Sequence, residues 1–324
     1  MSKIVVTGRI PEVGLDVLRS IQVGGAPATL WAWEHDDPIP TDVRDGELVD
    51  AVAAVTLLTD RVDDAFLDAA PDLRIVANVA VGFNNIDVDA CTARGVRVTN
   101  TPGVLTDATA DLAMGLILMV TRRLGEGERL IRSGAPWEWG MFMMLGTGLQ
   151  GRRLGIVGMG GIGTALADRA RAFGMEIAFH NRRDVDTDVA ERLGATRLPL
   201  DELLATSDIV SLNCPYTPET HHLIDRAALE SMRAEAFLVN TARGPIVDEA
   251  ALVDALEAGQ IAGAALDVFE AEPEVHPGLL DRDDVVLVPH LGSATVETRG
   301  AMAALAAENV EAFLATGEPT TPVN

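Results

Sequence analysis

Three ionisable side chains in the second half of the chain could together bind an anion and transfer a proton. They are Arg243, Glu272 and His290, and each follows a short apolar run typical of a buried strand. An arginine offers a planar fork to a carboxylate, and a histidine titrates near neutral pH, so it can act as a general acid or base. A glutamate beside that histidine favours the imidazolium. Because open parallel sheets bind ligands beyond the carboxyl ends of their strands, we expect the three side chains at one such edge.

A glycine-rich segment is the second sign of chemistry. Residues Gly158-Met159-Gly160-Gly161-Ile162-Gly163 stand between the apolar run Leu154–Val157 and a helical pattern over Thr164–Phe173. In this strand–turn–helix context, the G-x-G-x-x-G spacing allows a tight turn, a close approach to a pyrophosphate and close packing of helix on strand. The helix N-terminus attracts the phosphates. We therefore predict that Gly158, Gly160, Gly161, Ile162 and Gly163 bind a dinucleotide.

The next strand-like run, Glu176–Phe179, should end at the residues that contact the cofactor's adenosine ribose. An NAD enzyme usually has an acid there, which accepts from the 2′-hydroxyl. Here two guanidiniums follow instead, and they suit a 2′-phosphate, so NADP(H) is favoured. NAD(H) stays possible if Asp184 or Asp186 holds the hydroxyl. The residues predicted at this ribose are Asn181, Arg182 and Arg183.

Short apolar runs alternate with helical patterns along most of the chain, which is typical of an α/β fold with parallel sheets. Strands are expected at Lys3–Thr7, Val52–Leu58, Ile75–Asn78, Val96–Val98, Leu154–Val157, Glu176–Phe179, Ile209–Leu212, Phe237–Asn240, Gly263–Val268 and Val285–Val288. Long helices are expected over Thr106–Arg123 and Ala294–Leu314. We predict two Rossmann-like or flavodoxin-like domains with a cleft between them. Residues 100–290 would form the dinucleotide-binding domain, and residues 1–99 with 291–324 a discontinuous substrate-binding domain.

Composition excludes several classes of protein. With 324 residues, the chain is long enough for two domains, and 48% hydrophobic with 23% charged residues is a normal globular composition. A net charge of −24, with Lys3 as the single lysine, argues against a nucleic-acid partner and against an anionic membrane surface. The longest apolar stretch, 112–120, is about half the length that a membrane span requires.

Cysteine and histidine usage predicts neither a disulfide framework nor a metal site. Cys91 and Cys214 are far apart and show no metal-ligand spacing. The chain begins with a strand-like run in place of a signal peptide, so a reduced, cytoplasmic location is expected. His221 and His222 precede a helical pattern and are expected at the surface, without a role.

Several segments together resemble the D-isomer-specific 2-hydroxyacid dehydrogenase family, over nearly the whole chain. They are Asn100-Thr101-Pro102-Gly103, Asp107 with Thr109-Ala110-Asp111, the glycine segment, Val239-Asn240-Thr241-Ala242-Arg243-Gly244, Ala265-Leu266-Asp267-Val268-Phe269-Glu270 with Glu272-Pro273, and Pro289-His290-Leu291-Gly292. Within the family, the chain is most similar to glyoxylate/hydroxypyruvate reductases, partly through Trp137 and Trp139.

The resemblance implies a role for each residue of the site. Arg243 would hold the substrate carboxylate and carbonyl, His290 would supply the proton, and Glu272 would hold the imidazole. The backbone amides of Val81 and Gly82 would bind the substrate carboxylate, and Leu58 is also predicted at the substrate. Asp267 would hold the nicotinamide carboxamide. The remaining cofactor contacts are predicted at Thr109, Cys214, Pro215, Thr220, Thr241, Ala242, His290 and Gly292.

The resemblance also implies a homodimer joined through the cofactor domains, with Thr106–Arg123 and Trp137–Met144 near the interface. One departure from the reductase pattern is Gly140-Met141, where a proline is usual. The adjoining run Met141-Phe142-Met143-Met144 is soft and apolar, so the side chain of the substrate stays open.

We predict NAD(P)H-dependent reduction of a small 2-oxo acid, glyoxylate or hydroxypyruvate, to the D-2-hydroxy acid. The alternatives are a phosphoglycerate, D-lactate or phosphonate dehydrogenase, or a nucleotide-sensing protein that keeps the catalytic trio without turnover. The chain ends at Asn324, soon after the last helical pattern, which speaks against a regulatory domain of the phosphoglycerate type. Glu272 speaks against a formate dehydrogenase, in which a glutamine is expected at this position.

Overall fold

The chain forms two compact units in the computed structural model, which describes residues 2–324. The first unit contains the residues up to Leu105 and those from Ser293 to Asn324, and the second is Thr106–Gly292. The sequence analysis set the boundaries at 99/100 and 290/291, a few residues from each of these two connections. None of the helices in residues 2–324 is long and apolar enough to cross a membrane.

The first unit is built on a five-stranded parallel sheet in the order β4-β1-β5-β6-β7. This is the flavodoxin-like strand order. The strands are β1 (Lys3–Val6), β4 (Thr29–Ala32), β5 (Ala51–Thr56), β6 (Ile75–Asn78) and β7 (Arg97–Thr99), with a separate small hairpin of β2 (Gln22–Val23) and β3 (Ala26–Pro27). Sequence patterns predicted all of the sheet strands except β4, whose residues are only partly buried.

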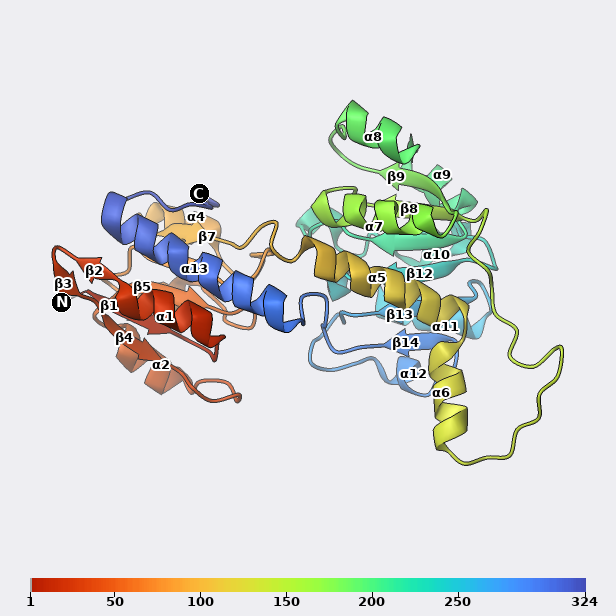
Figure 1. The fold of residues 1–324 in the computed structure, drawn as a ribbon, viewed down its shortest axis with the longest axis horizontal. Helices are drawn as coiled ribbons and strands as arrows, with labels where there is room; N and C mark the ends of the chain where they lie inside the picture. Colours follow the sequence, from red (N-terminus) through yellow and green to blue (C-terminus); the bar gives the residue numbers. More distant parts are fainter. Residues whose placement is uncertain (1) are drawn as a thin grey trace. The chain divides into compact units, whose positions relative to one another are not determined.

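The last helix of the chain belongs to the first unit, where it lies against the first helix (Figure 1). A Cβ placed on Gly14 would lie 2.8 Å from the Ala303 side chain, so this glycine allows the two helices to touch. Phe313 and the small side chains Ala303, Ala306 and Ala307 of the last helix complete a core over the sheet. The helices of this unit are α1 (Glu12–Ser20), α2 (Thr41–Leu48), α3 (Asp64–Ala69), α4 (Val88–Ala93) and α13 (Val296–Thr316).

The second unit contains a seven-stranded parallel sheet in the order β10-β9-β8-β11-β12-β13-β14. The direction of winding reverses between β8 and β11, and this is where Rossmann-type sheets bind nucleotides. Its strands are β8 (Arg153–Val157), β9 (Glu176–His180), β10 (Thr196–Arg197), β11 (Ile209–Leu212), β12 (Phe237–Asn240), β13 (Gly263–Leu266) and β14 (Val285–Leu287). The predicted α/β fold with two Rossmann-like parallel sheets is confirmed.

Helices cover both faces of this sheet, as buried parallel strands require. One apolar core joins the sheet to α5 and α7, and another joins its opposite face to α9, α10 and α11. The helices are α5 (Thr106–Thr121), α6 (Leu124–Arg132), α7 (Gly161–Ala172), α8 (Thr187–Leu193), α9 (Leu200–Thr206), α10 (Arg226–Ser231), α11 (Glu249–Glu257) and α12 (Pro277–Leu280). The central strands β8, β11, β12 and β13 are almost completely buried.

Between α5 and β8 the chain leaves the body of the second unit as an arm, residues 124–147. The expected helix over Thr106–Arg123 stops at Thr121, because Arg123 takes a left-handed conformation with φ 53°. The next helix, α6, buries none of its residues, and a long loop follows it before the chain returns to β8 (Figure 1). At the base of the arm, the Thr147 N–H donates to the Thr121 carbonyl at 2.7 Å.

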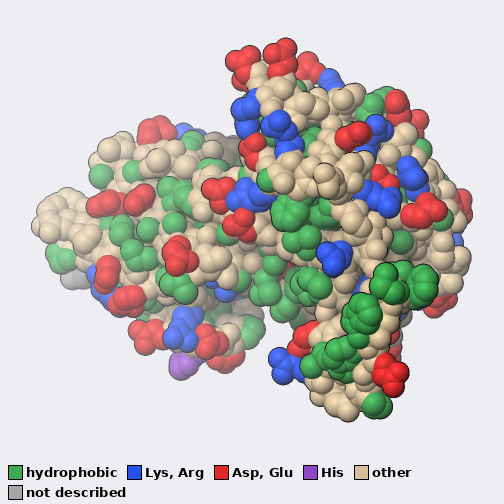
Figure 2. Space-filling model, turned by 45° about the vertical axis from the view of Figure 1, so that its right-hand side comes forward, with side chains coloured by type: hydrophobic (Ala, Val, Ile, Leu, Met, Phe, Trp, Pro, Cys, Tyr) green, Lys and Arg blue, Asp and Glu red, His purple; other side chains and the backbone are tan. Residues whose placement is uncertain are grey.

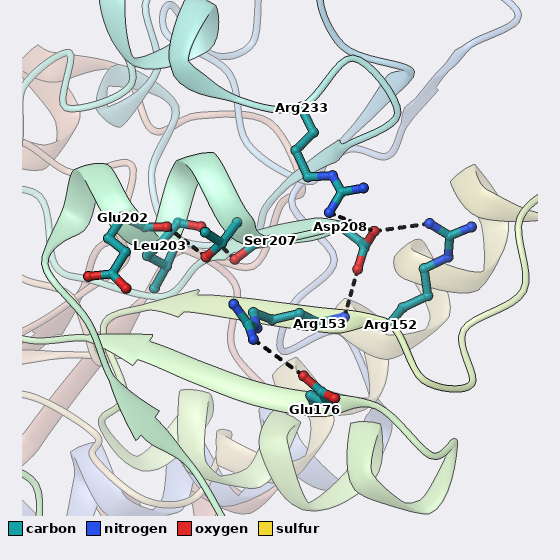
Figure 3. A network of polar contacts seen from close by, with 9 residues as sticks. Arg152, Arg153, Glu176, Glu202, Leu203, Ser207, Asp208 and Arg233 are labelled. Carbon is teal, nitrogen blue, oxygen red and sulfur yellow. Dashed lines mark hydrogen bonds and ion pairs between the residues drawn. The ribbon is translucent and has the colours of Figure 1, made fainter.

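Asp208 ties together the amino ends of neighbouring strands at the other edge of this sheet (Figure 3). Its carboxylate accepts from the Arg153 N–H at 2.9 Å and from the Arg152 guanidinium at 3.0 Å, and Arg233 lies 3.9 Å away. The Asp208 side chain is only 13% exposed. Burial alone would raise its pKa, but the Arg153 N–H and the Arg152 and Arg233 charges together lower the pKa below its usual range. The ionised form therefore stabilises the fold.

We expect Asp208→Asn to lower the free energy of unfolding at pH 7 by about 1–3 kcal/mol, since hydrogen bonds to a buried charge are lost. A carboxyl whose folded-state pKa is lowered stabilises the protein above its unfolded-state pKa and ceases to do so as the pH falls through the folded-state pKa. The difference between wild type and variant should therefore shrink in strong acid.

Urea titrations followed by circular dichroism at several pH values would measure this difference. Asp254→Asn is the matched control, because Asp254 forms an exposed ion pair with Arg226 and should cost less than about 1 kcal/mol. An equal loss in both variants, independent of pH, would contradict the stabilising role of Asp208.

Candidate active site

The glycine segment connects β8 to α7 through contacts that leave no room for side chains at two of its positions. Gly158 has φ 96°, and a Cβ on it would lie 2.5 Å from the Cys214 nitrogen. A Cβ on Gly163 would lie 2.5 Å from the Gly158 carbonyl oxygen. Both neighbours are backbone atoms that cannot move aside. The turn is therefore held against the loop after β11, with the N-terminus of α7 at its end.

Gly160 and Gly161 are exposed, in contrast. A Cβ on Gly160 would have no atom within 4 Å, and one on Gly161 would meet only Thr106, at 3.6 Å. The Asn181 side chain fixes this part of the turn, because its Oδ1 accepts from the Met159 N–H at 2.6 Å and its Nδ2 donates to the Met159 carbonyl at 3.3 Å. Asn181 thus shapes the turn through the backbone of Met159, and Ile162 is half-buried beside it.

Two buried polar atoms at the carboxyl edge of the sheet have no hydrogen-bond partner among residues 2–324. They are Oδ1 of Asn213, after β11, and Oγ1 of Thr241, after β12. An unpaired buried polar atom costs free energy, and a polar ligand at this edge would satisfy both atoms. Together with the open space above Gly160 and the N-terminus of α7, these atoms fit a bound dinucleotide.

Two arginines follow the end of β9, and the two acids that come after them bond to other groups. Arg182 and Arg183 are exposed immediately after Asn181. Both acids that could hold a ribose hydroxyl are committed elsewhere: Asp184 pairs with Arg197, and Asp186 caps α8 by accepting from the Asp188 N–H.

The remaining predicted cofactor residues lie around the same edge of the second unit. Thr220 is buried, and its hydroxyl accepts from the Thr217 N–H and donates to the Pro215 carbonyl, so it closes the turn that follows Cys214. Burial raises the pKa of the Cys214 thiol to about 11, which keeps it protonated and unreactive at neutral pH. Thr109 lies in the first turn of α5 and Ala242 in the turn after β12, both buried.

His290 stands on a strained turn that a buried carboxylate holds in place. Its φ is 52°, in the left-handed region that a non-glycine residue seldom adopts. Asp267 is 1% exposed, and its carboxylate accepts from the Leu291 N–H at 2.5 Å and from the Gly292 N–H at 2.9 Å, while its carbonyl accepts from the His290 N–H at 2.8 Å. Burial raises the pKa of Asp267, although those two N–H groups lower it. Asp267 therefore fixes the backbone on both sides of the His290 side chain.

The His290 ring pairs with Glu272, as predicted from the spacing of strand ends. Nδ1 lies 2.9 Å from Glu272 Oε2, and Oε1 of the same carboxylate accepts from the Phe269 N–H at 3.0 Å. Burial alone would raise the pKa of Glu272, but the hydrogen bond and charge of His290, the Phe269 N–H and the charge of Arg243 lower it below its usual value. An ionised carboxylate only accepts, so Nδ1 carries the proton. Nε2, on the other side of the ring from Glu272, bonds to none of the described residues.

Arg243 completes the trio in the turn after β12. Burial lowers its pKa, and the charge of Glu272 opposes that shift, so the two groups are near neighbours. Its Nη1 donates to the Ala242 carbonyl at 2.7 Å, and the Asn240 side chain donates to the Arg243 carbonyl at 2.9 Å. An arginine guanidinium stays charged in proteins, so this turn places a positive charge beside the Glu272–His290 pair.

The structure adds one contact that the sequence did not predict: Nε2 of His222 lies 2.7 Å from Glu270, and the His222 side chain is 33% exposed. A histidine without metal or catalytic spacing gives no sequence signal, since its partner lies 48 residues away.

In the first unit, the loop after β6 carries two backbone N–H groups that none of the described residues accepts from, those of Val81 and Gly82. Two amides orient this loop: Asn78 donates to the Gly82 carbonyl at 2.9 Å, and Asn100 donates to the Val81 carbonyl at 2.8 Å. In a trans peptide, the Gly82 N–H points away from the Val81 carbonyl, and the Val81 N–H points away from the Ala80 carbonyl, which accepts from the Thr101 N–H at 3.0 Å. Both N–H groups are therefore directed away from these donors, as an anion site needs. Leu58 is 38% exposed in the turn after β5.

A Rossmann sheet with a glycine turn at its switch point, and with arginine, glutamate and histidine at neighbouring strand ends, defines the class of nicotinamide-dependent oxidoreductases. Comparison with known proteins gives the family. Residues 114–292 match the model of the D-isomer specific 2-hydroxyacid dehydrogenase, NAD binding domain. The protein belongs to the D-isomer specific 2-hydroxyacid dehydrogenase family.

Similar proteins match over almost the whole chain. A glyoxylate reductase of Thermococcus onnurineus is 47% identical over 327 residues, which cover 99% of this chain and 96% of that protein. A crystal structure of a Thermus thermophilus protein has a TM-score of 0.90 with 41% identity, covering 99% of this chain and 100% of that one. An NADPH-dependent glyoxylate/hydroxypyruvate reductase from Sinorhizobium meliloti, solved with NADP and malonate, has a TM-score of 0.83 with 36% identity, covering 99% and 96%.

We expect Gly160→Ala to abolish tight cofactor binding without lowering the melting temperature. The free protein has space for the new methyl group, and φ −89° with ψ −153° suits alanine, so only an approaching pyrophosphate would meet the methyl group. Fluorescence titration with NADPH and a thermal melt would measure the two effects. Gly148→Ala, which also adds a methyl group in open space, is the control. Unchanged NADPH affinity in Gly160→Ala would contradict the site.

Proposed function

We propose that this protein reduces glyoxylate or hydroxypyruvate to the D-2-hydroxy acid, with NADPH as the preferred cofactor. The observation that carries the proposal is the 2.9 Å pair of His290 and Glu272 next to Arg243, at the edge of the sheet that holds the glycine turn. The relatives named glyoxylate reductase, at 44–49% identity, support the choice of substrate.

In this proposal the cofactor supplies a hydride to the carbonyl carbon of the substrate. Arg243 binds the carboxylate and the carbonyl oxygen, which orients the carbonyl carbon and polarises the bond. His290 donates the Nε2 proton to the oxygen as negative charge develops there. Glu272 accepts from Nδ1, keeps the ring in the required tautomer and stabilises the imidazolium before the transfer. The reduction therefore consumes one proton for each hydride transferred.

The proposal extends to the first unit, as the substrate-binding domain. The N–H groups of Val81 and Gly82 suit a substrate carboxylate, because Asn100 holds the Val81 carbonyl and the Thr101 N–H holds the Ala80 carbonyl of the same two peptides. A two-carbon or three-carbon 2-oxo acid suits Arg243, because its carboxylate and carbonyl oxygen are the two groups that this guanidinium would bind. Leu58 would contact the remaining atoms of the substrate, and Asp267 the nicotinamide carboxamide.

The preference for NADPH is supported by the charges at the end of β9. Arg182 and Arg183 are exposed, while Asp184 and Asp186 are held by Arg197 and by the cap of α8. Guanidiniums bind a phosphate through paired, charge-assisted hydrogen bonds. The NADPH-dependent Sinorhizobium meliloti reductase, solved with NADP, is a structural relative with this cofactor.

We further propose that two copies associate through the arm, residues 124–147. The arm exposes a set of large apolar side chains that a protein in solution would normally cover, and Figure 2 shows apolar side chains gathered on the projecting part of this unit. They are Leu124 (50% exposed), Ile131 (58%), Trp137 (51%), Trp139 (77%), Met141 (72%), Phe142 (88%) and Leu145 (61%). A second copy that offers the same surface would bury them in a symmetric interface.

We expect His290→Ala to lower kcat for glyoxylate reduction by roughly 10²–10⁴-fold, as the loss of a general acid does, and to leave the affinity for NADPH unchanged. Initial rates with glyoxylate and hydroxypyruvate, with each cofactor, would measure this. His35→Ala is the control, because His35 is exposed in the first unit and belongs to no part of the site. A wild-type protein that binds NADPH but reduces neither acid would contradict the proposed function.

We expect the double variant Arg182→Ser with Arg183→Ser to lower kcat/KM with NADPH by roughly 10- to 100-fold and to leave the value with NADH within about twofold. The loss corresponds to charge-assisted hydrogen bonds of about 1.5–3 kcal/mol. Arg226→Ser, which removes an exposed arginine from α10, is the control. A wild-type preference for NADH would contradict the assignment of the two arginines and leave the chemistry at His290 unaffected.

A further inference from the structure

His222 and Glu270 join the loops that follow β11 and β13, the strands on either side of β12 in the second unit's sheet. Nε2 of His222 donates to Glu270 Oε1 over 2.7 Å, and each side chain is 33% exposed. His222 lies in the chain between β11 and α10, and Glu270 lies two residues before Glu272. The bond therefore ties a loop without catalytic groups to the loop that holds the partner of His290.

The backbone of His222 holds a third loop. Its N–H donates to the Pro245 carbonyl at 2.9 Å, two residues after Arg243, and the Ile224 N–H next along the chain donates to the Ile246 carbonyl at 3.0 Å. His222 itself takes a left-handed conformation, with φ 49°. His222 thus bonds to the turn of Arg243 through its backbone N–H and to the loop of Glu272 through its ring.

Glu270 and Glu249 form the other half of the connection. Glu270 Oε2 accepts from the Glu249 N–H at 3.3 Å, and the Glu270 N–H donates to Glu249 Oε1 at 2.7 Å. Glu249 is the first residue of α11 and only 5% exposed. Burial raises its pKa, the Glu270 N–H opposes this, and the charge of Glu270 adds to it, as two adjacent carboxyls require. The ring of His222 supplies a donor beside this pair of acids.

The two loops that this connection holds touch each other directly. A Cβ placed on Gly244 would lie 1.8 Å from the Phe269 carbonyl oxygen and 2.4 Å from the Glu270 nitrogen. Backbone therefore packs on backbone, with no flexible side chain between the residue after Arg243 and the residues before Glu272. Any shift of one loop moves the other, and with it the distance between Arg243 and the Glu272–His290 pair.

We propose that His222, Glu270 and Glu249 form a loop brace whose task is to position Arg243 relative to Glu272 and His290. The three members of the loop brace are positioning residues, because they act through the two loops and through no contact with a reacting atom. The proposal rests on the proposed reduction for its kinetic test, since it concerns the same site.

Two uncharged replacements of His222 differ in whether the side chain is long enough to bond to Glu270. Asparagine tolerates a left-handed backbone but is too short to reach Glu270, whereas glutamine carries an amide nitrogen about as far out as Nε2. We expect His222→Asn to raise KM for the 2-oxo acid and to lower kcat/KM roughly 10- to 100-fold, because displacements of about 1 Å cost that much. KM for NADPH should change less, because the cofactor residues predicted in the same loop, Cys214, Pro215 and Thr220, all precede His222, and the glycine turn packs on Cys214. His222→Gln should restore most of the loss.

The control is His35→Asn, which changes an exposed histidine of the first unit and should behave as the wild type. A purely structural defect would lower the melting temperature and the active fraction of His222→Asn, and it would leave KM for the 2-oxo acid as it is. An unchanged KM for the 2-oxo acid in His222→Asn would thus overturn the proposal, as would a failure of His222→Gln to recover activity while it folds normally.

Hydrogen exchange gives a readout that does not depend on turnover. Peptides that cover residues 244–250 and 267–275 contain the N–H groups of Glu249 and Glu270, and they should exchange faster in His222→Asn than in wild type or His35→Asn. If the wild type reduces neither acid, the proposed function fails, and exchange alone then decides on the loop brace. Faster exchange in both peptides supports it, and exchange equal to wild type overturns it.

Discussion

The chemistry of this site depends on one buried carboxylate, that of Asp267. His290 occupies a left-handed conformation, which costs of order 1–3 kcal/mol at a non-glycine residue and persists only where its surroundings hold it. Asp267 does so from the end of β13, by accepting the N–H groups of Leu291 and Gly292. These two bonds fix the direction in which the imidazole leaves the backbone, and with it the 2.9 Å contact with Glu272.

The acidic side chains near the site are paired with donors, although the protein as a whole has a net charge of −24. Each acid near the site has its own donor: Glu272 has His290, Glu270 has His222, and Asp184 has Arg197. A carboxylate that is already paired neither repels an anionic substrate strongly nor competes for its arginine. Salt screens the more distant charges over about 8 Å, so a basic site can function on an acidic protein.

The fold itself was largely predictable from sequence, and its exceptions have physical causes. Strands such as β11 and β12 are buried on both faces, so they appear as short apolar runs, and their predicted bounds agree with the structure. In contrast, β4 and the two-residue β10 lie at sheet edges, where partial exposure removes that pattern. The break between α5 and α6 was also not predicted. It occurs where Arg123 takes a left-handed conformation, and only glycine or asparagine at this position would have indicated such a conformation in the sequence.

Residue types and their order in the chain determined the class of protein: the glycine turn, the three ionisable groups at strand ends and the alternation of strands with helices all follow from local sequence. The contacts that hold the site were decided only by the tertiary structure. His222 and Glu270 are 48 residues apart, and Asp267 and Gly292 are 25 apart, so no local pattern joins them. Strand order brings such residues together, because parallel strands place all their carboxyl ends at one edge of the sheet.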